Sequence, residues 1–224
     1  MTRLVGADHA SFPYSAVVFV QARFPSGAVF TGSGVLVGDN DVLTASHLVH
    51  SAGNGGLAEA VQVVPGLDGG SAPFGQITAR WANFIPVDAD GDGRITRAEG
   101  QHDLAVLGLD REPGVVAGQF TLDREADSGP YTVTGYPRTG FDASGPRMID
   151  DQGRARDDAG SGTLTYDGLT VSPGSSGGPV WQQTPEGPEV GGIVSTGSWA
   201  ADVSESWLML QAWIAGNDFL TASD

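Results

Sequence analysis

Three short segments carry the residue types that a serine nucleophile needs. DVLTASHLVH ends a strand-like run with His47, HDLAVLGL begins an apolar run with Asp103, and SPGSSGGPV holds Ser176 among glycines. An imidazole can remove the proton of a serine hydroxyl, a carboxylate can fix the imidazole in one tautomer, and glycines let backbone N–H groups face a developing oxyanion. Each segment alone also fits a polar strand end or a glycine turn. Together, in the order His, Asp, Ser, they favour acyl transfer.

The residues just before Asp103 have the spacing of a calcium-binding loop. DADGDGRITRAE (88–99) matches the EF-hand loop pattern, in which Gly93 at the sixth position would make the sharp turn. A hard cation needs about six to eight oxygen ligands, and this spacing supplies carboxylates together with a backbone carbonyl. The predicted Ca²⁺ ligands are Asp88, Asp90, Asp92, Arg94 through its carbonyl, Thr96 directly or through water, and Glu99. The competing interpretation is a solvated acidic turn.

This loop is not part of an EF-hand domain, because Pro86 would break an entering helix and no second loop pairs with it. Close carboxylates repel by about 4 kcal/mol per pair at an effective dielectric constant near 20, so the loop should open without a cation. Only three residues separate Glu99 from Asp103. We therefore expect Ca²⁺ to be a cofactor that orders Asp103, and through it His47.

A second acidic stretch, MIDDQGRARDDAG (148–160), could hold another cation through Asp150, Asp151, Asp157 and Asp158. Its spacing fits no ligand pattern, and its arginines favour a salt-bridged loop.

Composition predicts an all-β protein. The chain has 224 residues with 34 glycines, 13 prolines and 40% hydrophobic residues, and short apolar runs recur between Gly, Pro, Asn or Asp. Only ESWLMLQAWIAGNDF has apolar residues at helical intervals, which predicts a C-terminal helix packed on the last barrel. A boundary near Pro113 to Gly118 would divide the chain into domains at residues 1–115 and 116–224.

Charge and composition exclude several classes. A formal charge of −16 disfavours nucleic-acid binding, and the absence of cysteine removes disulfides, thiolate nucleophiles and thiolate metal sites. No run approaches the roughly 18 apolar residues of a membrane span, and the N-terminus lacks the apolar core of a secretory signal. We expect a monomer that does not insert into membranes.

With these motifs in this order, the chain resembles the trypsin-like (chymotrypsin-fold) serine endopeptidases along nearly its whole length. The resemblance implies two six-stranded antiparallel β-barrels with the site between them, and protein or peptide substrates. It implies His47 as general base, Asp103 as its orienting carboxylate and Ser176 as nucleophile, with the N–H groups of Gly174 and Ser176 as oxyanion hole. The implied substrate-binding residues are Thr170, Val171, Val194, Ser195, Thr196 and Gly197. The calcium loop and the resemblance together predict secretion.

Two positions differ from charge-selective members of that family. Thr170 stands where trypsin-type pockets carry an aspartate, and Val194 where glutamate-specific relatives carry a histidine. We therefore expect small or medium uncharged residues at P1, the residue whose carbonyl is attacked, although Asp202 or Glu205 could reach the pocket. Ser175 also replaces the aspartate that pairs with a freed N-terminus in zymogens, so calcium would organise the site instead.

Two alternatives remain at the level of sequence. One is a proteolytically inactive barrel that uses its calcium loop for adhesion or interaction. The other is an esterase of the α/β-hydrolase type, which is disfavoured because Ser176 lies in GSSGGP rather than in a G-x-S-x-G elbow.

Overall fold

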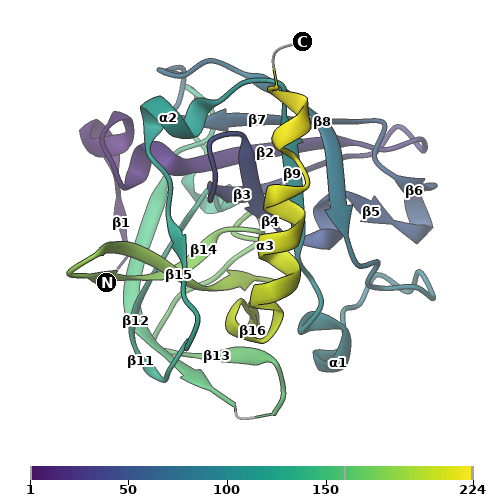
Figure 1. The fold of residues 1–224 in the computed structure, drawn as a ribbon, viewed down its shortest axis with the longest axis vertical. Helices are drawn as coiled ribbons and strands as arrows, with labels where there is room; N and C mark the ends of the chain where they lie inside the picture. Colours follow the sequence, from purple (N-terminus) through teal and green to yellow (C-terminus); the bar gives the residue numbers. More distant parts are fainter. Residues whose placement is uncertain (1, 159, 223–224) are drawn as a thin grey trace.

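The computed structural model describes residues 2–158 and 160–222. A first barrel closes through six antiparallel strands in the order β2-β3-β4-β9-β8-β7, with β7 pairing back to β2 (Figure 1). Alternate residues of β2 point inward, because Val18, Val20 and Ala22 are fully buried. The strands are β2 (Val17–Arg23), β3 (Val29–Leu36), β4 (Asp41–Thr44), β7 (Ala60–Pro65), β8 (Ile77–Phe84) and β9 (Ala105–Leu109).

A second barrel closes in the same way. Its ring runs β11-β14-β15-β16-β13-β12, with β12 pairing again to β11, while short β1 extends β12 and β10 pairs in parallel with β15. The predicted fold class is confirmed: two six-stranded antiparallel barrels. The strands are β1 (Arg3–Leu4), β10 (Thr121–Leu122), β11 (Gly129–Gly135), β12 (Ile149–Asp157), β13 (Thr163–Asp167), β14 (Pro179–Thr184), β15 (Gly187–Val194) and β16 (Trp199–Asp202).

Register brings the chemically important strand ends together. Thr44, the last residue of β4, pairs with Ala105, the first residue of β9. His47 just after β4 and Asp103 just before β9 therefore lie at the same end of the first barrel. In the second barrel Pro179 pairs with Ile193, so the segment leading into β14 lies beside the segment leaving β15.

The remaining elements are short. A hairpin of β5 (His50–Ser51) and β6 (Gly56–Leu57) follows His47, and α1 (Arg97–Gly100) precedes Asp103. Helix α2 (Pro113–Ala117) begins with a proline at its first position, where the missing N–H costs nothing. The 3₁₀ turns are η1 (Gly6–Ala10), η2 (Tyr14–Ala16), η3 (Ser46–Leu48), η4 (Ala52–Asn54), η5 (Arg138–Gly140), η6 (Ser204–Ser206) and η7 (Asp218–Leu220).

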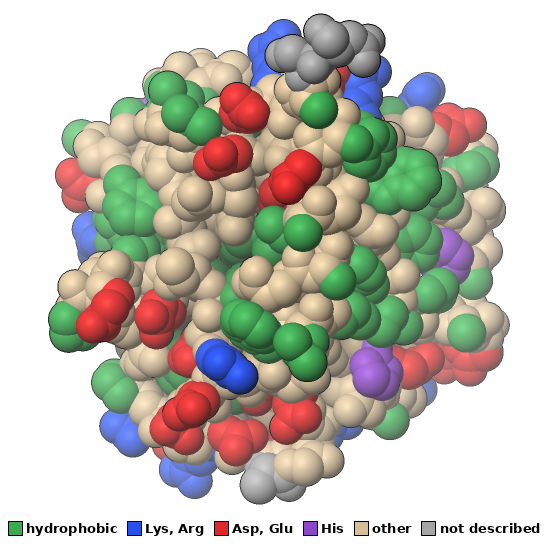
Figure 2. Space-filling view, in the orientation of Figure 1, with side chains coloured by type: hydrophobic (Ala, Val, Ile, Leu, Met, Phe, Trp, Pro, Cys, Tyr) green, Lys and Arg blue, Asp and Glu red, His purple; other side chains and the backbone are tan. Residues whose placement is uncertain are grey.

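The predicted C-terminal helix is present as α3 (Trp207–Ala215). It runs down the middle of the face in Figure 1, where Figure 2 shows hydrophobic side chains with acidic ones around them. Packing of this helix on the last barrel stays a prediction, because α3 contacts β9 of the first barrel while Arg124, between β10 and β11, lies over the Trp207 ring, and the segment after α3 is anchored on the first barrel. Asn217 donates to Asp41 Oδ1 at 2.8 Å, and the side chain of Leu220 lies over Gly108. Helical periodicity predicted a buried face but could not identify the barrel that covers it.

The connection between the barrels runs from the end of β9 through α2 to β10, and the predicted boundary at residue 115 falls inside α2. Strand β1 nevertheless pairs with β12 of the second barrel. The division at residue 115 stays a prediction. Among residues 2–158 and 160–222, no helix has both the length and the apolar character needed to cross a bilayer.

The buried carboxyl of Asp41 predicts an unusual pH dependence. Burial, with Asp218 and Asp39 nearby, raises its pKa from 3.8 to about 6. The folded state therefore binds the proton more tightly than the unfolded state, and this group's contribution to stability falls as pH rises from about 4 to about 6. Asp41→Asn should gain stability relative to the wild type across that window, by roughly 3 kcal/mol at pH 7.

Chemical denaturation at pH 4 and pH 7 measures this gain. Asp110→Asn serves as control, because its bond from Arg80 lowers the pKa of Asp110 and predicts the opposite trend. If the free energies of unfolding of the wild type and of Asp41→Asn differed by the same amount at pH 4 and at pH 7, the raised pKa assigned to Asp41 would be wrong.

Candidate active site

The His47 and Asp103 side chains form a closely bonded pair. His47 Nδ1 donates to Asp103 Oδ2 at 2.7 Å, and the His47 backbone N–H donates to Oδ1 of the same carboxylate at 3.0 Å. The Asp103 side chain is fully buried, whereas that of His47 is 22% exposed. The carboxylate thus fixes the imidazole in the tautomer that leaves Nε2 free to accept a proton.

The pair also shifts both pKa values. Burial alone would lower the pKa of His47, but the charge and hydrogen bond of Asp103 outweigh it and raise that pKa above 6.5. Burial alone would raise the pKa of Asp103, but His47 and the Ser195 hydroxyl outweigh it and lower that pKa. Asp103 is therefore ionised wherever His47 is neutral, as a general base requires.

Ser195 is the third partner of the buried carboxylate. Its hydroxyl donates to Asp103 Oδ2 at 2.6 Å, and Ser195 itself is buried. The sequence predicted Ser195 only as a wall of the substrate cleft, since nothing in GIVSTG indicates a side-chain partner. The bond joins the end of β15 in the second barrel to a residue of the first.

The Ser176 loop is held tightly by its glycines. Gly174 has φ +99°, and a Cβ there would come within 2.5 Å of the Tyr136 carbonyl oxygen. Gly177 has φ +80°, and a Cβ there would meet the Ser33 carbonyl oxygen at 2.2 Å. Both positions therefore require glycine, and the loop fits between the two barrels with its backbone against each.

Ser33 of β3 is a site residue that the sequence analysis missed. Its hydroxyl donates to the Gly174 carbonyl at 2.9 Å and accepts the Tyr136 N–H at 2.8 Å, while its N–H donates to the Ser176 carbonyl at 2.7 Å. The first barrel thus orients peptide groups on both sides of Ser176, the predicted nucleophile. A serine inside VFTGSGVL looks like any strand residue, so sequence offered no signal for this role.

The predicted substrate-binding residues lie along two adjoining segments. Val194 is fully buried and exchanges backbone hydrogen bonds with Gly177 and Gly178, which places the following residues beside the Ser176 loop. The N–H groups of Ser195 and Thr196 both donate to the Trp199 carbonyl. Gly197 is exposed and Val171 half-buried. Thr170 is exposed, and its N–H donates to Asp151 Oδ2 at 2.6 Å.

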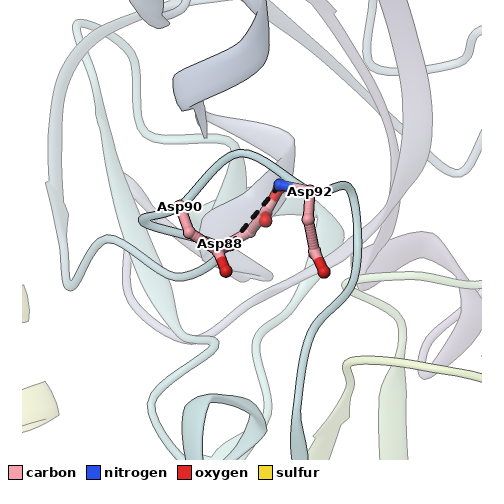
Figure 3. Close-up of side chains that lie close together, drawn as sticks. All are labelled: Asp88, Asp90 and Asp92. Atoms are coloured by element: carbon pink, nitrogen blue, oxygen red, sulfur yellow. Dashed lines mark hydrogen bonds between the residues drawn. The ribbon is translucent and has the colours of Figure 1, made fainter.

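The acidic loop brings three of its predicted ligands together. One carboxylate oxygen from each of Asp88, Asp90 and Asp92 lies within 4.8 Å of the others (Figure 3). The backbone bends sharply here, with φ +71° at Gly91, φ +77° at Gly93 and φ +52° at Asp88. The Gly93 N–H donates to both carboxylate oxygens of Asp88 at 3.2 Å. Burial and the neighbouring aspartates raise the pKa of Asp88 despite that bond.

The other predicted ligands take up different roles in this structure. Glu99 and Thr96 form a capping box at the start of α1, in which Glu99 Oε2 accepts the Thr96 N–H at 2.9 Å and the hydroxyl at 2.7 Å. Glu99 Oε1 accepts the Asp88 N–H at 3.2 Å, which closes the base of the loop. These bonds, led by those from Thr96, lower the pKa of Glu99. The Arg94 N–H donates to Asp92 Oδ1 at 2.7 Å.

Helix α1 links this loop to Asp103 and to the second barrel. The Asp103 N–H donates to the Gly100 carbonyl at 3.3 Å. Arg97 donates to Thr163 Oγ1 at 3.0 Å and forms an ion pair with Asp158. Gly100 lies so close to the Trp199 ring that a Cβ would come within 2.3 Å of its Nε1. The backbone of Asp103 is thus anchored from both barrels.

The aspartates of the second acidic stretch (148–160) bind other groups of the protein. Asp150 pairs with Arg3 at 3.0 Å, Asp151 accepts the Thr170 N–H, and Asp158 pairs with Arg97. Within the described part of the chain, the metal-compatible group of carboxylates is the one at Asp88, Asp90 and Asp92. Ala159 lies outside the described residues.

Two antiparallel six-stranded barrels with this topology define a chymotrypsin-like fold. The chain belongs to the family of trypsin-like peptidases, because the model of the trypsin-like peptidase domain matches residues 32–188, well over half of its length.

Relatives in sequence are bacterial proteases. The chain is 31% identical over 132 residues to the extracellular metalloprotease of Bacillus subtilis, covering 57% of this chain and 40% of that protein. It is 28% identical over 210 residues to the glutamyl endopeptidase of Staphylococcus aureus, covering 89% of this chain and 58% of that protein. It is 25% identical over 182 residues to the glutamyl endopeptidase of Bacillus licheniformis, covering 78% of this chain and 51% of that protein. The chain thus spans about half the length of these relatives.

Solved structures share the fold. A Glu endopeptidase in complex with MPD superposes with a TM-score of 0.75 at 17% identity, covering 96% of each chain. The protease Anisep from Arthrobacter nicotinovorans gives a TM-score of 0.66 at 21% identity, covering 84% of this chain and 90% of its own. At these identities the likeness concerns the fold alone.

Proposed function

We propose that the protein is a serine endopeptidase that hydrolyses peptide bonds through Ser176, His47 and Asp103. The observation that carries the proposal is the buried Asp103 carboxylate, which accepts hydrogen bonds from His47 Nδ1, the His47 N–H and the Ser195 hydroxyl. Membership of the trypsin-like peptidase family supports the same function.

In the proposed mechanism His47 Nε2 takes the proton of the Ser176 hydroxyl as its oxygen attacks the substrate carbonyl carbon. The N–H groups of Gly174 and Ser176 stabilise the oxyanion, and Asp103 stabilises the imidazolium. His47 then donates its proton to the leaving amine, which releases the first product and leaves an acyl group on Ser176. Water, deprotonated by His47, hydrolyses this ester and restores the enzyme.

Covalent labelling separates this proposal from an inactive interaction module. A fluorophosphonate probe should label the wild type at Ser176, because only an activated hydroxyl reacts rapidly, and Ser176→Ala should stay unlabelled. Ser172→Ala is the matched control, since Ser172 lies in the same loop outside the triad. Mass spectrometry of the labelled peptide identifies the site. If the wild type neither reacts with the probe nor cleaves casein at millimolar calcium, the protein is an inactive interaction module instead.

The P1 pocket should favour uncharged side chains. Val194 is buried, and Asp151, only 3% exposed, bonds to the Thr170 N–H. Glutamate-specific members of the family carry a histidine where Val194 stands, so an acidic P1 residue would lack that partner here. The names of two relatives specify glutamyl cleavage, and we propose that this chain departs from them.

Peptides that differ only at P1 test this departure. Gln and Glu have almost the same shape, so their ratio isolates the effect of charge. We expect kcat/KM to be about tenfold or more higher for Gln than for Glu, because Val194 offers the carboxylate no polar partner and desolvating the charge costs free energy. Faster cleavage after Glu would show that the pocket shares the preference named in its relatives.

We further propose that Ca²⁺ binds the loop 88–99 and supports activity. The EF-hand spacing, the three adjacent aspartates and the positive φ at Gly93 support this proposal. Glu99 would have to exchange its capping bonds for the cation, while Arg94 and Thr96 would add oxygens. A bound divalent cation would neutralise the carboxylates and, at about a thousand times its Kd, contribute about 4 kcal/mol to the ordered loop. Because the Asp103 N–H donates to the Gly100 carbonyl, an ordered loop would also fix the backbone of Asp103.

Asp90→Asn tests the cation site, because Asp90 is exposed and the bond that its side chain accepts from the Asp92 N–H is long, at 3.4 Å. The free calcium needed for half-maximal activity should rise about tenfold or more, and calorimetry should give the same shift in Kd. Glu186→Gln removes one exposed charge from the β14–β15 turn and should change neither value. Full activity of chelator-treated wild type would end the proposal.

A calcium-supported peptidase would act outside the cell, where calcium is abundant. The Bacillus subtilis relative is described by its name as extracellular. Recovery of the native protein only from the cytosol would contradict this location.

A further inference from the structure

The peptide groups around Ser176 differ in whether their N–H groups have partners. The N–H groups of Ser175, Gly177 and Gly178 donate to backbone carbonyls of the protein. Within the part of the chain that the structure describes, the N–H groups of Gly174 and Ser176 have no protein acceptor. The proposed mechanism assigns these same two groups to the oxyanion, so the fold of the loop leaves them available for it.

Two backbone hydrogen bonds set the direction of these free N–H groups. A peptide group is planar and trans, so its N–H points away from its C=O. The Pro173 carbonyl accepts the Arg138 N–H at 2.8 Å, which turns the Gly174 N–H the other way. The Ser175 carbonyl accepts the Gly178 N–H at 2.9 Å, which does the same for the N–H of the proposed nucleophile. The peptide group between Gly174 and Ser175 joins the two, so its orientation must be held as well.

Ser33 of β3 holds this middle peptide group. Its side chain is fully buried, and its hydroxyl donates to the Gly174 carbonyl at 2.9 Å while it accepts the Tyr136 N–H at 2.8 Å. Gly174 has no Cβ to resist rotation of its backbone. Rotation of the middle peptide group would break the bond from Ser33 and leave a buried carbonyl unpaired, which is unfavourable.

The surroundings of Ser33 keep its hydroxyl in this position. A Cβ at Gly135 would come within 2.6 Å of Ser33 Oγ, and a Cβ at Gly178 would come within 3.3 Å of Ser33 Cβ. The Ser33 N–H donates to the Ser176 carbonyl and its own carbonyl accepts the Thr44 hydroxyl, each at 2.7 Å. The side chain is therefore enclosed by glycines, and its backbone is fixed on both sides.

The residue before the proposed nucleophile cannot hold the loop by charge. Ser175 is 4% exposed, and its hydroxyl accepts the Ser172 N–H at the long distance of 3.4 Å. A neutral side chain at this position forms no ion pair. The short bonds of Ser33 are therefore the firmer support of the loop.

We propose that Ser33 is a positioning residue for the oxyanion hole. Its hydroxyl keeps the middle peptide group in the orientation that leaves the N–H groups of Gly174 and Ser176 free for the oxyanion. Because the hydroxyl acts through the backbone and touches no substrate atom, its loss should weaken transition-state stabilisation and leave the binding of uncut substrate unchanged. This inference rests on the proposed peptidase function.

Ser33→Ala tests the proposal through kinetics. We expect kcat to fall about tenfold to a hundredfold, whereas deletion of a whole oxyanion donor costs about 100- to 1,000-fold. KM should stay within about twofold, because substrate binding does not use the hydroxyl. The Ki of a peptide aldehyde, whose adduct with Ser176 places its oxygen in the hole, should rise by the same factor as kcat/KM falls.

Two further variants separate this role from packing and from stability. Ser33→Cys keeps a side chain of similar shape but offers only a weak donor and acceptor, so it should also lose kcat, and it replaces Ser33→Ala if that variant does not fold. Ser15→Ala is the matched control, because Ser15 is 2% exposed and its hydroxyl donates to the Ala117 carbonyl at 2.6 Å. It should leave kcat unchanged.

The outcomes distinguish this inference from the proposed function. A wild type that neither cleaves peptides nor reacts with a fluorophosphonate would overturn both. With an active wild type, an unchanged kcat in Ser33→Ala, full activity in Ser33→Cys, or an equal loss in Ser15→Ala would overturn the role of Ser33 alone. Calorimetry gives a readout without turnover: Ser176→Ala should bind an uncut peptide equally well with and without Ser33→Ala, and weaker binding in the double variant would contradict the proposal.

Discussion

One buried negative charge organises the site of this protein. The Asp103 carboxylate is excluded from solvent, and an isolated charge in that position would be strongly unfavourable. It is stable there because three donors converge on it: two from His47 and one from Ser195. Each bond also imposes a geometry, since the imidazole takes one tautomer and the end of β15 is fixed against the first barrel. The same interaction thus orients the proposed base and fixes the segment that carries Ser195, one of the predicted substrate-binding residues.

Several of the contacts between the two barrels lie next to the proposed reacting groups. Ser33 of the first barrel fixes the peptide groups around Ser176. Arg97 and Gly100 hold the segment before Asp103 against the second barrel. Relative movement of the barrels would therefore displace Ser176, His47 and Asp103 together. The acidic loop lies at this junction, directly before α1. A cation bound there would act on a segment that both barrels already hold in place. Removal of the cation should therefore reduce activity before it unfolds the protein.

Much of this arrangement could be predicted from sequence, and the exceptions have physical reasons. Short apolar runs between turn residues indicated an all-β fold, and the glycines around Ser176 indicated a backbone whose N–H groups could face an oxyanion, while the lack of room for side chains at Gly174 and Gly177 became visible only in the structure. Helical periodicity located α3 but could not identify its partner, because periodicity reports a buried face and not what covers it. The roles of Ser33 and Ser195 depend on contacts between residues 141 and 92 positions apart, which no local pattern encodes. Glu99 fits two local patterns at once, the last ligand of a calcium loop and the third residue of a capping box, and the structure shows it in the second.

The pKa of the His47 imidazole, followed by NMR in the wild type and in Asp103→Asn, shows whether the buried carboxylate controls the proposed base. Removal of the buried charge leaves desolvation as the main effect on the ring, so we expect a pKa above 6.5 in the wild type and a pKa lowered by at least about one unit in the variant. An unchanged His47 pKa in a correctly folded Asp103→Asn variant would show that the carboxylate does not control the imidazole.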